Sequence, residues 1–270
     1  MRVALTIDDL PFVGPAQDGV PAATARLANA LASVPTTAFA NCDSVDSAGA
    51  ALRPFLDAGA AIGNHQAGHD DLGAVGEEAF LRGATSCHAA LTGWLGAAPR
   101  YFRYPYLRTG ATSAIRDAVR AAIERLPATI APVTIDNHEW WLAARYAESK
   151  DPVRRAEIAQ AYRSHLRAAT VHARQLAQDK LGRDPAQILL VHANELNADH
   201  LADLLRALAD DGVVFVPLDR ALQDPLYSAP DESATARGVS WLYRVAPATP
   251  PEAQHFENAS WDALRARFGP

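Results

Sequence analysis

Two adjacent carboxylates and a pair of imidazoles are the residues of this sequence best suited to do chemistry together. Asp8 and Asp9 end the apolar run 3–7, and His65 and His69 lie four residues apart. Because neighbouring residues of an extended chain point to opposite sides, we expect the two aspartates to do different jobs, one holding a metal ion and one facing a substrate. The alternative is an Asp-Asp turn that only ends a strand and caps the next helix.

Two histidine nitrogens and one carboxylate leave coordination positions for water on a divalent ion. Such an open site is typical of catalytic rather than structural metal centres. We therefore expect Asp9, His65 and His69 to hold one divalent metal ion. Zn2+ is the first expectation, with Co2+, Mn2+ or Ni2+ as alternatives. The same ligand set occurs in non-haem iron oxygenases, so neighbouring groups must decide the reaction.

Two further groups could complete a hydrolytic site. His192 ends the apolar run 188–191, and histidine is a natural donor of a proton to a leaving amine. A carboxylate close to His192 would raise the pKa of its imidazole and keep it protonated at neutral pH. Arg103 could pair with Asp8, and the alternative for this arginine is a surface ion pair.

The elements that position these residues read as strands alternating with helices. Each polar cluster follows a predicted strand, and active sites of α/β barrels and doubly wound sheets are built at that end of the strands. The fold class that we predict is α/β, a single-domain incomplete or distorted (β/α) barrel with a helical insertion and a C-terminal extension. The predicted strands cover residues 3–7, 36–40, 60–63, 100–103, 129–135, 188–191 and 213–216, and the predicted helices cover residues 21–34, 46–59, 77–95, 112–126 and 198–209.

The remaining segments are an insertion and a C-terminal tail. We expect residues 1–223 to form the barrel, with two helices in an insertion at about residues 143–182 that is dense in Ala, Arg and Glu. Residues 224–270 are too aromatic for a free linker. We expect them to pack on the barrel and to end in a short helix that begins at Ser260.

Composition narrows the class of partner. A net charge of −6 without a Lys- or Arg-rich run argues against nucleic acid and against an anionic membrane, and no apolar stretch approaches the length of a membrane span. A strand that begins within three residues of Met1 leaves no room for a signal peptide, so a cytoplasmic location is expected, or a secreted or periplasmic one if a leader has been removed. We expect Cys42 and Cys87 to be buried or idle thiols, since no C-x-x-C pattern supports a disulfide framework or a thiolate zinc site.

The order and content of these motifs resemble the polysaccharide deacetylases, the NodB-homology family also known as carbohydrate esterase family 4. This family includes chitin, peptidoglycan and xylan deacetylases, and the resemblance implies a TIM-like barrel and a zinc-dependent hydrolase of carbohydrate metabolism. Five short blocks carry it: Thr6-Ile7-Asp8-Asp9-Leu10-Pro11, His65-Gln66-Ala67-Gly68-His69, Arg103-Tyr104-Pro105-Tyr106, Asp136-Asn137-His138-Glu139-Trp140 and Leu190-Val191-His192.

The resemblance also implies roles for single residues. Asp8 would be the catalytic base, oriented by Arg103, and His192 the general acid. Either Asp136 or Glu139 would tune that histidine. The remaining implied roles are metal binding by Asp9, His65 and His69, oxyanion binding by the backbone N–H of Tyr106, and an acetate pocket lined by Leu190. Apart from the resemblance, Trp140 could stack on a sugar, and the alternative for this large aromatic is a place in the core.

Three positions depart from the family pattern. Leu10 replaces a glycine, Gln66 replaces the hydroxyl residue that would brace the loop between the two histidines, and Glu139 replaces the second aspartate of the fourth block. We expect a metal-dependent deacetylase that removes acetyl groups from an N-acetylated or O-acetylated sugar or oligosaccharide. The alternatives are a hydrolase of another C–N bond, such as that of a cyclic ureide or imide, and a non-catalytic glycan-binding module. Retention of Asp8, Arg103 and His192 together speaks against the binding module.

Overall fold

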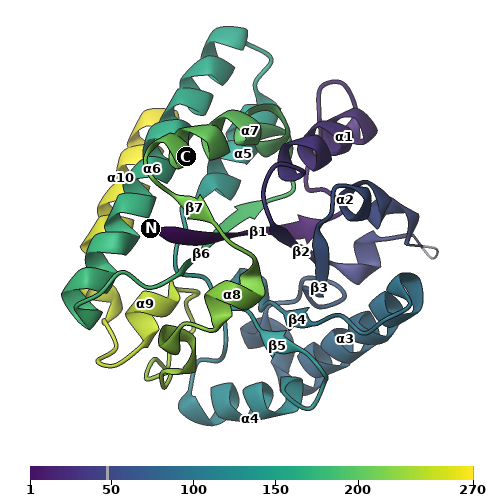
Figure 1. Ribbon diagram of the computed structural model, residues 1–270, viewed down its shortest axis with the longest axis vertical. Coiled ribbons are helices and arrows are strands. Elements are labelled where there is room, and N and C mark those ends of the chain that lie inside the picture. Colours follow the sequence, from purple (N-terminus) through teal and green to yellow (C-terminus); the bar gives the residue numbers. More distant parts are fainter. Residues whose placement is uncertain (47–48, 270) are drawn as a thin grey trace.

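A parallel sheet organises the molecule, and its first strand pairs with three other strands. The computed structural model describes residues 1–46 and 49–269, and its sheet has the strand order β5-β4-β3-β2-β1-β6, with β7 paired to the start of β1 (Figure 1). The predicted α/β fold class is confirmed. The strands are β1 (Arg2–Leu10), β2 (Thr36–Ala40), β3 (Ala61–Asn64), β4 (Tyr101–Phe102), β5 (Thr129–Ile130), β6 (Gln187–His192) and β7 (Val214–Phe215).

The sheet curls towards a barrel because the residues after β5 reach across to β6. Ile135 pairs with Leu189, and the Leu190 N–H donates to the Ile135 carbonyl over 3.1 Å. The predicted strand 129–135 is therefore interrupted after Ile130 rather than continuous. This bridge brings the polar block that follows Ile135 beside the end of β6, where His192 lies.

Helices cover the outside of the curled sheet (Figure 1). They are α1 (Val20–Leu31), α2 (Arg53–Asp57), α3 (Leu72–Leu95), α4 (Ser113–Ile123), α5 (Glu139–Glu148), α6 (Pro152–Leu181), α7 (Glu195–Asp210), α8 (Leu218–Leu222), α9 (Trp241–Arg244) and α10 (His255–Phe268). The insertion forms α5 and α6. The terminal helix begins at His255, five residues before the predicted start, which places Phe256 within it.

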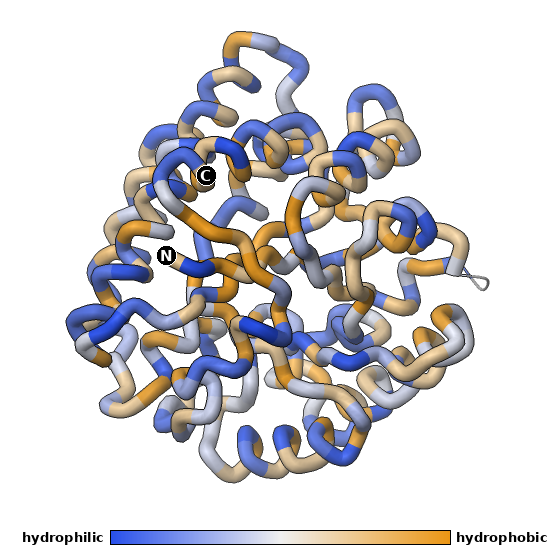
Figure 2. The backbone as a smooth tube through the Cα atoms, in the orientation of Figure 1, coloured by the Kyte–Doolittle hydropathy of each residue, from blue (hydrophilic) through white to orange (hydrophobic). Residues whose placement is uncertain are grey.

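The central strands have two differently packed faces. Leu5 and Ile7 of β1 belong to the large apolar cluster that also contains residues of α1 and α7, whereas Ala4 belongs to a smaller cluster with Phe39 and Ile188. Figure 2 shows these strands as an apolar centre surrounded by more hydrophilic helical segments. Because side chains alternate along a strand, Thr6 and Asp8 fall on the same face as Ala4.

The helix predicted at residues 46–59 is wrong for most of its length. Residues 47–48 lie outside the described residues, Gly49 is left-handed with φ 68°, and a 3-10 turn at Ala50–Leu52 precedes the short helix α2. Pro54 lies in the first turn of that helix, where its missing N–H costs nothing. The regular helix therefore begins only at Arg53.

The prediction of unpaired cysteines is also wrong. Cys42, in the 3-10 turn Cys42–Ser44 after β2, forms a disulfide with Cys87 on the buried face of α3, with Cα atoms 5.3 Å apart. The two residues are separated by 45 positions, so only the packing of α3 against the end of β2 brings them together. Across the part of the chain that the structure describes, no helix is long and apolar enough to cross a membrane.

Candidate active site

Asp8 and Asp9 lie where β1 departs from regular pairing. The register with β2 shifts between Ile7 and Leu10, and Asp9 has a left-handed backbone with φ 65°. Both carboxylates consequently approach one imidazole, with Asp8 Oδ2 at 3.5 Å and Asp9 Oδ1 at 3.6 Å from His65 Nε2. The expectation that they point to opposite sides is wrong, because it assumed a regular extended backbone.

Asp9, His65 and His69 form a cluster whose ligand atoms all lie within 4.8 Å of one another. The His65 Nδ1 lies 2.9 Å from the carbonyl oxygen of Arg103, which can only accept a hydrogen bond. Nδ1 therefore carries a proton, and the lone pair of the neutral ring is on Nε2, the nitrogen that faces the carboxylates. A carboxylate and an oriented imidazole lone pair are donors that Zn2+ and similar divalent ions accept.

The ionisation of this cluster also fits a cation. Burial and the charge of His65 lower the pKa of His69 to about 4, against the opposing effect of Asp9 and Asp8, so that imidazole is neutral at pH 7. Burial raises the pKa of Asp9, but the charges of His192, His65 and His69 and a hydrogen bond from Asn41 outweigh it and lower that pKa. An anionic Asp9 and a neutral His69 are in the protonation states that metal binding requires.

Gln66 braces the loop between the two histidines. Its Oε1 accepts the Asp70 N–H over 2.9 Å, and its Nε2 donates to Asp70 Oδ2 over 2.7 Å. Gly83 of α3 makes room for this amide, because a Cβ at that position would lie 2.0 Å from Gln66 Nε2. The amide therefore takes over the bracing expected of a hydroxyl residue.

Arg103 holds Asp8 from inside the barrel. Its side chain is 1% exposed, and its Nη1 lies 3.3 and 3.2 Å from the two Asp8 oxygens. The same guanidinium donates to Thr6 Oγ1 over 3.1 Å and, through Nε, to the Ala131 carbonyl over 2.6 Å. A surface ion pair is excluded, and Asp8 is fixed in orientation beside the metal cluster.

His192 pairs with Glu139 and not with Asp136. Its Nδ1 lies 2.8 Å from Glu139 Oε2, and that carboxylate is buried. Burial lowers the pKa of His192, but the charge and hydrogen bond of Glu139, followed by the charges of Asp9 and Asp8, raise it to about 10. The imidazole is therefore protonated at neutral pH and can give up a proton.

Asp136 has a different environment. Its Oδ1 accepts the His138 N–H over 3.4 Å, and burial together with the charge of Asp136 raises the pKa of Glu257 to about 8. In the described parts of the chain, no hydrogen bond or ion pair joins Asp136 to His192. The left-handed turn at His138, with φ 53°, starts α5 at Glu139 and directs that carboxylate to the histidine instead.

Three residues that the sequence analysis missed complete this network. Asn194 and Asn197 donate to Glu139 Oε1 over 2.5 and 2.6 Å, and Tyr162 Oη donates to Asn197 Oδ1 over 2.7 Å. Asn194 caps α7 by accepting the Asn197 N–H. An asparagine two positions after His192 at the start of a helix is a capping signal that could have drawn attention to it.

Residues 1–131 match the family model for polysaccharide deacetylase. Over these residues the chain is similar to that family. The resemblance predicted from the sequence blocks is confirmed, and the match covers the blocks that contain Asp9, His65 and Arg103. No curated protein sequence matches the chain.

Solved structures of the same family share its fold. The chain is similar to a family 4 carbohydrate esterase from Streptomyces lividans in complex with acetate, with 23% identity, a TM-score of 0.53 and coverage of 82% of this chain and 95% of that one. A polysaccharide deacetylase from Bacillus cereus has 19% identity and a TM-score of 0.57, with 80% and 90% covered. A pseudoenzyme of the same esterase family from Bacillus anthracis has 16% identity and a TM-score of 0.58, with 82% and 65% covered.

The predicted substrate-binding residues lie in three environments. The Tyr106 side chain is 52% exposed, and its ring lies 4.4 Å from that of His69. Trp140 is 49% exposed, and its ring lies 5.7 Å from that of Trp261 in α10. Leu190 is buried on β6 but belongs to none of the three apolar clusters. Trp261 is a neighbour of the site that the sequence blocks do not include.

Proposed function

We propose that this protein is a metal-dependent deacetylase that hydrolyses the acetyl group of an N-acetylated or O-acetylated sugar or oligosaccharide. One observation carries the proposal, which is that three kinds of group lie close together. The carboxylate of Asp8, held by Arg103, lies beside the cluster of Asp9, His65 and His69. The charges of Asp8 and Asp9 also help to raise the pKa of His192. A cation site, a base that need not bind the cation and an acid are the parts that amide hydrolysis requires.

Proton transfer is divided between Asp8 and His192. A divalent ion bound to Asp9, His65 and His69 would polarise the acetyl carbonyl and make water acidic enough to ionise near neutral pH. Asp8 takes one proton from the attacking water. His192 donates one proton to the leaving nitrogen or oxygen as the bond to the acetyl carbon breaks, so the products are acetate and the free amine or hydroxyl.

The substrate side of the proposal rests on two tryptophan rings, the Tyr106 backbone and Leu190. Trp140, next in sequence to Glu139, forms an aromatic pair with Trp261 of α10, and the planes of the two rings are tilted by 33°. Such rings provide apolar faces for sugar stacking. The Tyr106 N–H would bind the developing oxyanion, and Leu190 would line the acetate pocket. No Lys- or Arg-rich run supports a nucleic-acid partner.

The disulfide bears on the compartment. Disulfides persist in secreted and periplasmic proteins and are rare in the cytosol. The Cys42–Cys87 pair therefore favours the secreted or periplasmic alternative over a cytoplasmic location.

Acetate release tests the function. The purified protein is incubated with N-acetylglucosamine oligomers and with acetylated xylan, before and after chelation and after addition of Zn2+, Co2+, Mn2+ or Ni2+. We expect acetate from at least one substrate, loss of release on chelation, and recovery on metal addition. Release that continues in the chelated, metal-free protein would refute the proposed mechanism.

A non-catalytic glycan-binding module is the second candidate, because a pseudoenzyme is among the similar structures. It predicts glycan binding without turnover, unchanged in Asp8→Asn. The same assay should include allantoin and succinimide. Ring opening of either, without acetate release from any sugar, would identify a hydrolase of another C–N bond.

A further inference from the structure

The turn that carries Tyr106 has a backbone that its own residues do not favour. Tyr106 has φ 55° and ψ 12°, and Leu107 also has φ 55°. Left-handed conformations are unfavourable for residues with a Cβ, and two in succession need support from the surrounding structure. The Tyr106 ring lies 4.4 Å from the ring of His69, so the shape of this turn affects the candidate metal centre directly.

That support comes from the C-terminal extension. Gly238 approaches the turn so closely that a Cβ at this position would lie 1.7 Å from the Tyr106 carbonyl oxygen, 2.9 Å from its carbonyl carbon and 3.2 Å from Leu107 Cβ. The first two atoms are backbone, which cannot rotate away as a flexible side chain can. Gly238 has no left-handed φ, so close approach and not backbone conformation is what requires a glycine here.

The segment around Gly238 is itself firmly held. The Trp241 N–H donates to the Val133 carbonyl over 2.6 Å, and Ser240 Oγ donates to the Thr134 carbonyl over 2.8 Å. These carbonyls belong to the stretch that bridges β5 and β6. The extension is thus anchored to the barrel wall on one side of Gly238 and meets the turn on the other.

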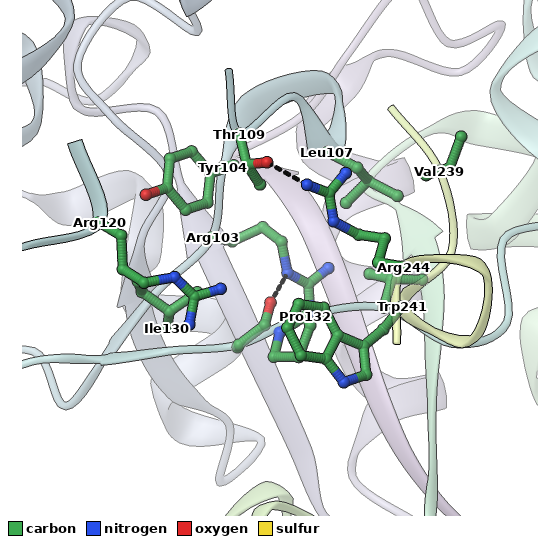
Figure 3. Close-up of a pocket in the computed structure, with 12 residues that line it drawn as sticks. Arg103, Tyr104, Leu107, Thr109, Arg120, Ile130, Pro132, Val239, Trp241 and Arg244 are labelled. Atoms are coloured by element: carbon green, nitrogen blue, oxygen red, sulfur yellow. Dashed lines mark hydrogen bonds between the residues drawn. The ribbon is translucent and has the colours of Figure 1, made fainter. Parts of the chain in front are cut away.

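A small cavity lies beside the turn, so the contact with Gly238 is needed to fix the position of the turn. It has a volume of about 30 Å³, room for one or two water molecules, and Leu107, Thr109, Val239 and Arg244 are among the residues that line it (Figure 3). The turn is therefore not fixed by close packing on that side. Arg244, 2% exposed, spans the gap by donating to Thr109 Oγ1 over 2.5 Å and to Asp231 Oδ2 over 2.9 Å.

We propose that Gly238 is a positioning residue, whose contact with the Tyr106 peptide holds the Tyr106 ring and backbone N–H at the candidate metal centre. The segment that carries it lies outside the family-matched residues 1–131, so the C-terminal extension completes a site whose ligands come from the N-terminal half. The consequence for turnover rests on the proposed deacetylase function. The consequence for the position of Tyr106 does not.

Gly238→Ala tests this, with Gly93→Ala as the matched control. Gly93 lies on the exposed side of α3 with nothing within 4 Å of an added Cβ, so both variants add the same methyl group but only one meets backbone. In Gly238→Ala we expect kcat to fall by about 10- to 100-fold with little change in KM or metal content, since a misplacement of about 1 Å can cost about 10²-fold. Gly93→Ala should behave as the parent protein.

A second readout does not depend on turnover. Because the Tyr106 ring lies 4.4 Å from the His69 ring, its ring current should shift the NMR signals of the His69 imidazole protons. We expect those signals to move in metal-free Gly238→Ala but not in Gly93→Ala. If Gly238→Ala does not fold, Thr109→Val removes the anchor of Arg244 on the same loop and should move the same signals. Unchanged His69 signals in a folded Gly238→Ala protein, or in Thr109→Val in its place, would overturn the proposal. A parent protein that releases no acetate would instead refute the proposed function.

Discussion

The two sides of the candidate active site differ in how closely their carboxylate is hydrogen-bonded within the chain. On the metal side, formed by Asp9, His65 and His69, the closest approaches between carboxylate and imidazoles are 3.4 and 3.6 Å, too long for strong hydrogen bonds. On the acid side, the buried Glu139 accepts hydrogen bonds of 2.5 to 2.8 Å from Asn194, Asn197 and His192. The acid side is held by short hydrogen bonds within the chain, whereas the three candidate ligands of the metal side lie within 4.8 Å of one another without such bonds between them.

We expect only the metal side to depend on a ligand. One carboxylate oxygen and two imidazole nitrogens within 4.8 Å of one another are a donor set that a divalent cation accepts. The acid side needs none, because Tyr162 and the two asparagines already orient Glu139. We therefore expect changes on the metal side to remove metal and activity together, and changes on the acid side to affect activity alone.

Removing a metal ligand should have the largest effect. Asp9→Ala, His65→Ala and His69→Ala each delete one of three protein donors, and we expect bound metal and acetate release to fall to background together. Metal analysis by mass spectrometry and the acetate assay measure the two quantities on the same samples. Metal retained in His69→Ala would break the assignment of the site. Metal lost in Asp8→Asn but kept in Asp9→Ala would mean that the two aspartates have exchanged roles.

Removing the acid should cost less than removing the metal and should leave the ion in place. His192→Ala deletes a proton donor that contacts no candidate ligand atom by a hydrogen bond in the described structure. We expect a fall in kcat of about 10²- to 10⁴-fold at unchanged metal content. Asp8→Asn should behave in the same way, because Arg103 and not the cation holds that side chain. Loss of metal in His192→Ala would show that the two sides are not independent.

The carboxylate of Glu139 should determine the alkaline limit of activity. A general acid works while it is protonated, so activity of the parent protein should decline only as pH rises through the His192 pKa of about 10. Burial lowers the pKa of His192, and the charge of Glu139 opposes that effect. Glu139→Gln removes this charge, so the His192 pKa should fall and the alkaline limb of the pH–rate profile should move to lower pH. A pH–rate profile and NMR titration of His192 check this, with Asp136→Asn as the control. A limb that moves in Asp136→Asn and not in Glu139→Gln would identify Asp136 as the tuning group.

Much of the site could be predicted because its residues follow strands. Asp9, His65 and His192 each lie within two residues of the end of a predicted strand, and parallel strands bring their C-terminal ends to one rim. The choice between Asp136 and Glu139 could not be made, since it depends on the left-handed turn at His138. No periodicity in the sequence marks such a turn at a residue other than glycine.

Long-range packing explains what the sequence did not reveal. Tyr162 reaches the acid side from the insertion, and Gly238 reaches Tyr106 from the extension, each across segments without a shared motif. Asp9 and Asp8 face one imidazole because of a local register shift in β1. In each case the deciding contact is tertiary, and the composition of the local segment permits several arrangements.

Breaking the disulfide should have the smallest effect on turnover and should act on the metal side alone. The Cys42 N–H donates to the Gln66 carbonyl over 3.4 Å, and the Asp43 N–H donates to the Ala67 carbonyl over 3.0 Å. The turn that carries the disulfide therefore supports the loop between the two histidines. A disulfide that closes a loop of this length contributes about 4 kcal/mol to stability in the chain-entropy model. The double variant Cys42→Ser with Cys87→Ser should therefore unfold at a lower temperature and bind metal several-fold more weakly, while kcat at saturating metal and the His192 pKa stay unchanged. Calorimetry, metal titration and NMR of His192 measure these quantities. A changed His192 pKa in this variant would show that the acid side also depends on the turn after β2, and unchanged metal affinity would show that Gln66 and Asp70 hold the loop without it.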